Sequence, residues 1–428
     1  MGTDVLIVGA GVIGSAVAKA VAERGHSVTV VDSHGIAGHG STSSSAAIVR
    51  LHATSVDAVV LAAEALPYWH KWRDFLAAPQ DEPLAALHTC GSVILDDGSG
   101  FVEQVSAAMS TVQVAHQRWD HDEMRRRLPL FDLHAFGPPT LPTDDRFWAD
   151  PADLIPAAVY TPDSGWVDDP ALAAANLLYA ARRAGAAFRP HRTVTDVLVR
   201  AGRCRGVTLD DGTTLDADAV VNAAGPHSAR INALADVSAA MTVHTAALRQ
   251  ELHHLAAPPG LVPETGRMHV VDGDLGINFR PEGGGALLVG SGGAACDEKI
   301  YVDPDDWDQP IRPAEWERHV LRLARRIPDL QVPNRPAGVT GLYDVTPDWM
   351  PIYDRTALDG FYVAIGTSGN QFKTAPLVGE LMSELIERNG RRPTTADELT
   401  LAGPATGQPI RLAPYSATRS PTQDGRRG

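Results

Sequence analysis

Residues 4–14 read DVLIVGAGVIG, and this stretch decides the fold. Its first five residues form an apolar run typical of a buried β-strand, and the glycines that follow have the spacing Gly-x-Gly-x-x-Gly. Gly9 permits a tight turn, Gly11 lets the backbone approach a pyrophosphate, and Gly14 lets a helix pack closely against the strand. The N-terminus of that helix offers unpaired N–H groups and a positive dipole end to phosphates. The stretch therefore predicts the start of a dinucleotide-binding domain.

The residues after this stretch complete the same unit. A helix-compatible segment contains small residues at Ala18 and Ala22, breaks at Gly25, and leads to a second apolar run over residues 27–31 that ends at Asp32. A carboxylate at the end of the second strand can accept hydrogen bonds from ribose hydroxyls. Because strand, glycines, helix and acid are all in register, the sequence favours a dinucleotide site over an ordinary glycine-rich turn.

The bulk composition is that of an acidic globular protein. At 428 residues the chain can form two compact domains or one large one. Its net charge of −15 argues against nucleic acid or an anionic membrane as the main partner. No apolar run reaches the roughly 18–20 residues of a membrane helix, and the start of the chain lacks the basic flank of a signal peptide. We therefore expect a cytoplasmic protein, and its three scattered cysteines indicate no metal cluster.

The chain changes its pattern in the middle and then returns to the first one. Residues 170–184 predict a helix that begins after an Asp N-cap, and residues 215–225 predict a strand ending in small residues, as at the ligand edge of a parallel sheet. Residues 240–300 instead contain short apolar runs separated by glycine turns, which indicates an antiparallel sheet. A further strand ends in glycine within residues 360–366, and the composition from Arg391 onward indicates a loosely held tail.

Four parts of the sequence together resemble a known family. They are the glycine stretch ending at Asp32, residues 40–50 (GSTSSSAAIVR), residues 165–168 with 220–225 (GWVD and VVNAAG), and residues 341–348 with 366–373 (GLYDVTPD and GTSGNQFK). In this order they are similar to the FAD-dependent D-amino acid oxidase family, closest to its sarcosine oxidase and dimethylglycine dehydrogenase-like branch. The resemblance covers residues 3–390. The last pair is its most specific part, since the glycine stretch alone fits many FAD and NAD proteins.

The resemblance implies an α/β (α+β) fold in two interleaved parts. One is a discontinuous Rossmann-type FAD-binding domain, expected over residues 1–85, 151–236 and 335–390. The other is a substrate domain built on a mixed, mainly antiparallel β-sheet, expected over residues 86–150 and 237–334. Residues 391–428 are left as the tail.

The resemblance also implies a reaction. We expect an FAD-dependent oxidoreductase that oxidises the C–N bond of a small amino acid or N-methyl amino acid, of the sarcosine, glycine or D-amino acid type. Hydride would pass to flavin N5, and the imine would then hydrolyse in water. One alternative is an electron-relay or structural flavoprotein subunit of a heteromeric amine dehydrogenase complex. Another is a biosynthetic amine oxidase with a bulky natural-product substrate, and an electron-acceptor or subunit partner stays open in each case.

Two cations match the positions at which the family clamps a substrate carboxylate, and one aromatic residue matches a position in the active-site lining. Arg50 and Lys373 suit the clamp because a guanidinium binds a carboxylate bidentately and an ammonium adds a point charge. Surface cations are the alternative reading for both. Tyr343 falls where the family places an aromatic lining residue, with a core tyrosine as the alternative.

The residues expected to contact FAD come from the matching segments. They are Gly9, Gly11, Ile13, Gly14, Asp32, Ser41, Thr42, Ala224, Gly225, Gly341, Gly369, Asn370, Gln371, Phe372 and Lys373. The loop over residues 366–373 would bring backbone amides and the lysine charge to the pyrimidine end of the flavin, where hydride arrival places negative charge. For Ser41 and Thr42, a helix-capping role is the alternative to contact with the FAD phosphates.

Four departures from the family pattern limit these expectations. Members with covalently bound flavin attach it through a Cys or a His at the positions that are Gly341 and Ser44 here, so we expect noncovalent FAD. Asn278 stands where related members often have a Tyr. Leu288 falls near the sequence position of the lysine with which monomeric sarcosine oxidases activate oxygen, so the electron acceptor is open.

His253 and His254 are adjacent in a strand and face opposite ways, which argues against a metal site.

Overall fold

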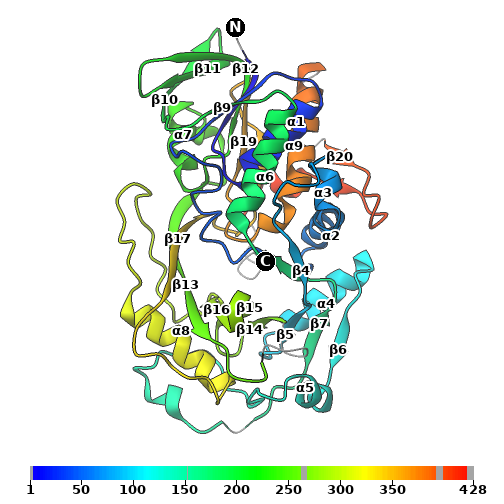
Figure 1. Cartoon of the computed structure of the whole chain (residues 1–428), viewed down its shortest axis with the longest axis vertical. Coiled ribbons are helices and arrows are strands. Elements are labelled where there is room, and N and C mark those ends of the chain that lie inside the picture. Colours follow the sequence, from blue (N-terminus) through cyan, green and yellow to red (C-terminus); the bar gives the residue numbers. More distant parts are fainter. Residues whose placement is uncertain (1–2, 152, 262–267, 392–398, 422–428) are drawn as a thin grey trace.

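The computed structural model describes residues 3–151, 153–261, 268–391 and 399–421. Two large β-sheets organise these residues, and Figure 1 shows one sheet in the upper part of the view and the other in the lower part. The chain passes between the two sheets several times, so both are built from segments that are distant in the sequence.

The first sheet is the predicted nucleotide-binding sheet. Its strands are, in spatial order, β10 (Val194–Arg200), β11 (Arg203–Leu209), β12 (Thr214–Asn222), β1 (Thr3–Val8), β2 (Val28–Val31) and β9 (Ala187–Arg189), with β19 (Phe361–Ile365) paired to β12 and β18 (Ile352–Arg355) paired to β19. The central strands β9, β2, β1, β12 and β19 are parallel. Their carboxyl ends therefore lie at one edge, which is where α/β sheets bind ligands.

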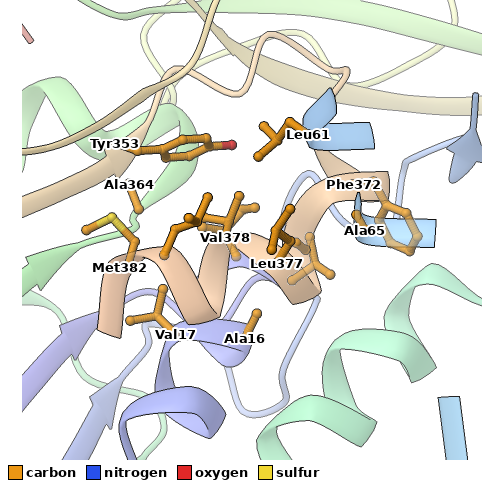
Figure 2. Packing of buried hydrophobic residues seen from close by; sticks show 14 of the residues in the cluster. Ala16, Val17, Leu61, Ala65, Tyr353, Ala364, Phe372, Leu377, Val378 and Met382 are labelled. Atoms are coloured by element: carbon orange, nitrogen blue, oxygen red, sulfur yellow. The ribbon is translucent and has the colours of Figure 1, made fainter. Parts of the chain in front are cut away.

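Helices α1 (Val12–Glu23), α6 (Pro170–Arg183) and α9 (Ala375–Arg391) belong to this sheet, and α1 packs against both of the others. Helix α6 begins as the sequence predicts: the Asp169 carboxylate accepts a hydrogen bond from the Leu172 N–H at 2.8 Å. Figure 2 shows α9 inserted between α1, α2 (Val56–His70) and strands β18 and β19. Gly379 allows this insertion, because a Cβ there would lie only 2.4 Å from the Ala16 carbonyl oxygen of α1.

The second sheet is the predicted, mainly antiparallel one. Its strands are, in spatial order, β17 (Gly338–Val345), β13 (Ala246–Ala256), β16 (Ala286–Ser291), β15 (Ile277–Glu282), β14 (His269–Asp272), β5 (Ser92–Leu95), β7 (Ala158–Thr161) and β6 (Gln117–Trp119). All of its neighbouring strands are antiparallel except β14 and β5. The two sheets together confirm the predicted fold class.

Smaller elements fill the rest of the fold. They are a three-stranded sheet of β3 (Ile48–Val49), β8 (Gly165–Val167) and β4 (Leu87–Thr89), and the helices α3 (Trp72–Phe75), α4 (Phe101–Val112), α5 (His121–Arg127), α7 (Ser228–Leu234) and α8 (Pro313–Arg326). Helix α8 packs on strands β13, β15 and β16 of the second sheet. The short η5 turn (Phe372–Thr374) leads into α9.

Two strands that the sequence analysis assigned to the FAD-binding domain pair with the second sheet instead. Strand β7 lies within the expected FAD-domain segment 151–236, yet it pairs with β5 and β6 of the second sheet. Strand β17 lies within segment 335–390, yet it pairs with β13 along eight residues. A short apolar run predicts a strand, but it does not specify the strand's partner, which is set by long-range packing.

The expectation of a loosely held tail is wrong for residues 399–421. Five apolar side chains there are buried, namely Leu399, Ile410, Leu412, Tyr415 and Ala417. The segment forms β20 (Thr400–Leu401), β21 (Ile410–Arg411) and the turn η7 (Ala413–Tyr415). It is also tied down by bidentate ion pairs, Arg411 with Asp57 and Arg419 with Asp348. The overall composition, rich in Pro, Gly and Arg, predicts a loose segment, because it does not reflect the few residues that anchor the segment to the rest of the protein. Residues 392–398 and 422–428 lie outside the described part.

We predict that Gly379→Ala lowers the stability of the protein by about 1–3 kcal/mol, the usual range for overpacking a close contact. The added methyl group would overlap the Ala16 carbonyl, so α9 would have to move off α1. Urea denaturation followed by circular dichroism measures the change. Gly283→Ala is the matched control, because a Cβ at Gly283 meets no atom within 4 Å. Equal stability of Gly379→Ala and the control would contradict the close packing.

Candidate active site

The predicted glycine turn brings three backbone segments into contact. Gly9 has a φ of +106°, and a Cβ there would lie 2.4 Å from the carbonyl oxygen of Ala223, just after β12. A Cβ at Gly14 would lie 2.0 Å from the Gly9 carbonyl oxygen. Side chains at these two positions are therefore excluded, and α1 begins directly at the carboxyl edge of the sheet. This is the role that the sequence predicts for Gly9 and Gly14.

The N-terminus of α1 opens onto space that protein atoms leave free. Gly11 is its N-cap residue, and a Cβ there would meet only the Thr42 hydroxyl, at 3.4 Å. That hydroxyl accepts a hydrogen bond from the Val12 N–H at 3.1 Å, so Thr42 caps the helix, as the alternative reading of the sequence allowed. The residues therefore fit a dinucleotide phosphate, because a helix N-terminus attracts anions and only the Thr42 hydroxyl approaches a Cβ at Gly11.

Asp32 lies directly after β2, at the same edge. Its carboxylate accepts hydrogen bonds from the backbone N–H groups of Ala10 at 2.7 Å and His34 at 2.8 Å. These two bonds hold the carboxylate beside the glycine turn. A carboxylate can accept about four hydrogen bonds, so it retains capacity for the ribose hydroxyls that the sequence predicts.

The serine-rich loop after β2 is joined to β17 of the second sheet. The Ser41 hydroxyl donates a hydrogen bond to the Leu342 carbonyl at 2.5 Å. A Cβ at Gly341 would lie 2.7 Å from the Cβ of Ser44. The two positions at which relatives attach flavin are therefore neighbours in space, and neither carries a Cys or a His here.

The predicted loop over residues 366–373 is fixed against the same strand. The buried Asp344 carboxylate of β17 accepts hydrogen bonds from the Gly366 N–H at 2.7 Å and from the Thr367 hydroxyl at 2.5 Å. Burial raises the pKa of the Asp344 carboxyl. Gly369 packs on Tyr343 so closely that a Cβ would lie 2.2 Å from the ring. The loop and the tyrosine thus form one rigid wall.

This wall borders a cavity of about 560 Å³. Of the predicted catalytic residues, Arg50 and Tyr343 line it, together with four residues of the loop 366–373, namely Ser368, Gly369, Asn370 and Phe372. Further lining comes from residues 45–48, from strands β5 and β13 to β16, from residues 292–299 and from α8, and it includes Asn278. The cavity therefore lies where the second sheet meets the loops of the first.

The two predicted clamp cations are close enough to influence each other, but they occupy different places. Arg50 lines the cavity, and burial lowers the pKa of its guanidinium to about 10. Lys373 is buried beside the cavity, and its ammonium donates a hydrogen bond to the Asn370 carbonyl. Burial, and then the charge of Arg50, hold the pKa of Lys373 well below its usual value. Two desolvated cations in one region favour an anionic ligand.

Several predicted cofactor residues present their side chains to the protein interior. Ile13 is buried in α1, and the Gln371 amide oxygen accepts hydrogen bonds from Tyr353 at 3.3 Å and Thr374 at 2.8 Å. Ala224 and Gly225 follow β12, and Gly225 has a φ of +56°. For Ile13 and Gln371, the predicted contact with FAD would therefore have to involve the backbone.

Sequence reasoning missed two histidines that line the cavity, His52 and His269. Their rings stack in parallel with centroids 6.3 Å apart. A signal for His52 was present, because alternate residues of an extended segment point to the same side, and His52 is two residues after Arg50. Nothing local marks His269, which the pairing of β14 with β5 brings to the cavity.

Comparison with known proteins identifies the family. A profile of the FAD dependent oxidoreductase family matches residues 4–385. The chain belongs to this family. The predicted cofactor FAD and the predicted class of enzyme are thereby confirmed, and the residues of the glycine turn fit that cofactor. None of the described helices is both long and apolar enough to cross a membrane.

Individual relatives agree with this placement. Glycine oxidase of Geobacillus kaustophilus is 27% identical over 425 residues, which are 97% of each chain. A bifunctional tRNA 5-methylaminomethyl-2-thiouridine biosynthesis protein of Thiobacillus denitrificans is 24% identical over 390 residues, and the match spans 56% of that longer protein. Among solved structures, G. kaustophilus glycine oxidase (24% identity, 98% and 99% coverage) and P. horikoshii L-proline dehydrogenase (20% identity, 91% and 94% coverage) each give a TM-score of 0.74. These likenesses show the fold.

We predict that Gly11→Val abolishes FAD binding. The valine side chain would extend into the open space in front of α1, where the sequence and the helix terminus place a phosphate. The visible absorbance of the purified protein, relative to its protein content, measures bound flavin. Gly283→Val is the matched control, since the space around Gly283 is open, and it should purify with normal flavin. A fully yellow Gly11→Val protein would rule out this phosphate site.

We also predict that the flavin is bound without a covalent link. Acid precipitation should release all of it into the supernatant, because Gly341 and Ser44 carry no group that can attach to the flavin ring. The flavin absorbance of the supernatant and of the redissolved pellet decides the question. Flavin that remains in the pellet would reveal an attachment residue elsewhere.

Proposed function

We propose that this FAD-dependent oxidoreductase oxidises the C–N bond of a small amino acid or N-methyl amino acid, with Arg50 as the residue that receives the substrate carboxylate. The observation that carries the proposal is the desolvated Arg50 guanidinium on the wall of a 560 Å³ cavity, with the second cation Lys373 behind it. A guanidinium in such a place binds a carboxylate through two parallel hydrogen bonds.

The position of Lys373 gives it a different part in the clamp. Its ammonium donates to the Asn370 carbonyl rather than lining the cavity. It therefore adds positive potential behind the wall, while Arg50 makes the directional contact. A bound carboxylate would offset the repulsion between the two cations, which ties substrate binding to the electrostatics of the site.

The remaining lining positions the substrate and limits water. Tyr343 stands beside Arg50 and is held by its packing on Gly369. Apolar side chains, including Ile48 and Ile277, cover part of the cavity wall. Bound FAD supplies the acceptor for the two electrons removed from the substrate. The chain's own contribution is to hold the carboxylate and so fix the α-carbon in one place.

The relatives support an amino acid substrate. The names glycine oxidase and L-proline dehydrogenase both denote enzymes that act on the C–N bond of an amino acid. The buried guanidinium also favours an enzyme over a subunit that only relays electrons. Asn278 in the lining and Leu288 in β16 are the departures that leave the substrate side chain and the electron acceptor open.

Anaerobic titration of the yellow protein tests the proposal. Glycine, sarcosine, proline and D-amino acids are added in turn, and we expect at least one to bleach the flavin without oxygen. Air is then admitted, and the rate at which the colour returns distinguishes an oxidase from a dehydrogenase. If no amino acid on the panel bleaches the flavin, the proposed substrate class is wrong.

We predict that Arg50→Ala lowers kcat/KM for the active amino acid. The loss should correspond to about 2–5 kcal/mol of transition-state binding free energy, the range for truncating one partner of a buried charge pair. Lys373→Ala should shift kcat/KM in the same direction, and flavin content should stay near normal in both. Amines that lack a carboxylate should be affected much less. Arg203→Ala, which removes a half-exposed arginine paired with Asp359, is the control. Full activity of Arg50→Ala would remove the basis for a carboxylate clamp.

A further inference from the structure

We propose that His52 is a catalytic residue of this cavity, and that its imidazole takes a proton from the ammonium group of the bound amino acid. An amino acid carries an ammonium group at neutral pH, and its nitrogen must lose one proton before the lone pair can assist C–H cleavage. The inference rests on the proposed function, because it needs an amino acid in the cavity.

The burial and bonding of His52 carry the inference. Its side chain lines the cavity and is 1% exposed. Neither ring nitrogen has a hydrogen-bond partner among the described residues. Buried polar atoms in folded proteins are almost always paired, so an imidazole with both nitrogens unpaired at a ligand cavity indicates a partner that the ligand supplies.

His52 is also placed next to the proposed carboxylate site. The Arg50 guanidinium donates a hydrogen bond to the His52 backbone carbonyl at 3.2 Å, so the two residues are locked together. In an α-amino acid only the α-carbon separates the carboxylate from the nitrogen. A carboxylate on Arg50 therefore brings the ammonium group into the neighbourhood of the imidazole.

The surroundings keep the imidazole of His52 neutral before the amino acid binds, so one of its ring nitrogens carries no proton at that stage. The titratable and charged groups that face it are Arg50 on its own segment, His269 on β14 and Lys373 on η5. Burial, and then these three groups, hold the pKa of His52 well below its usual value. The Nδ1 atom of His269 pairs with the Ser92 hydroxyl at 2.8 Å, and burial lowers the pKa of His269 to about 3. His52 is therefore the imidazole that is left without a protein partner.

Substrate binding would change this electrostatic balance. A carboxylate on Arg50 offsets the positive field that opposes protonation of His52, so the imidazole becomes a stronger base when the amino acid is present. The transfer is balanced: one N–H bond of the ammonium breaks, one N–H bond forms on the imidazole, and the positive charge moves with the proton. The step needs no oxidant, and the proton returns to solvent after the product leaves.

The test compares His52→Gln with the wild-type holoenzyme. Anaerobic stopped-flow measures flavin reduction by the active amino acid across the neutral and alkaline pH range. We expect the wild-type rate constant per unit substrate concentration to change little over this range. His52→Gln cannot accept the proton, so its rate should fall by about 10²-fold near neutral pH. It should then rise about tenfold per pH unit, until the free ammonium of the substrate itself deprotonates.

Two controls separate proton transfer from a structural role. His253→Gln alters another buried imidazole, which does not line the cavity, and should keep the wild-type pH profile. Carboxylate inhibitors without an amine should bind His52→Gln as tightly as wild type, because Arg50 is intact. A His52→Gln profile parallel to that of wild type would overturn the inference, even if the rate were lower throughout.

Two further measurements keep the inference testable if His52→Gln loses its flavin. His52→Asn is a second variant that cannot accept the proton, and it should show the same steep pH profile. The ligand 2-aminoisobutyrate has no α-hydrogen and cannot be oxidised, so its binding to the wild type can be measured by calorimetry. Repeating the measurement in buffers of different ionisation enthalpy gives the number of protons released on binding. We expect none, and one proton released per site would overturn the inference. If no amino acid bleaches wild-type flavin, the proposed function fails; if the wild type is bleached but the two pH profiles are parallel, only the inference about His52 fails.

Discussion

The close meeting of Gly9, Gly14 and Ala223 is the constraint on which the rest of the structure depends. Each glycine replaces a side chain that would overlap a backbone carbonyl, so β1, α1 and β12 can touch only with this sequence. The contact places the α1 N-terminus at the carboxyl edge of the sheet. Helices α6 and α9 then pack on α1, and α9 carries the cofactor loop directly before it. The phosphate site and one wall of the cavity are therefore set by the same contact.

Strand β17 connects the cofactor site to the second sheet. Along four consecutive residues, 341–344, it contacts the serine loop through Gly341 and Leu342, packs Tyr343 on Gly369, and binds the cofactor loop through Asp344. Its other edge is paired with β13. The strand therefore belongs to the substrate sheet by pairing and to the cofactor site by contact, which explains why the sequence analysis assigned the whole strand to the FAD-binding domain.

The features that could be predicted from the sequence are mainly those that depend on interactions between residues close together in the chain. The β1–α1–β2 unit and helix α6 depend on local signals such as periodicity, caps and turns, and the structure contains both of them. Arg50, Tyr343 and Gly369 could be placed in one site because family motifs carry long-range information that periodicity lacks. The partner of β7, the anchoring of residues 399–421 and the position of His269 depend on contacts between distant segments, and no local pattern encodes them.

The packing of α1 between α6 and α9 has a consequence for biosynthesis. The first β-strand and helix leave the ribosome early, but the helix that completes their cover ends at Arg391. At typical translation speeds of about 5–20 residues per second, the apolar face of α1 stays incompletely covered for roughly 20–80 s. The nascent chain therefore exposes apolar surface until α9 has emerged. The complete cofactor site can form only after that point, since the loop over residues 366–373 directly precedes α9.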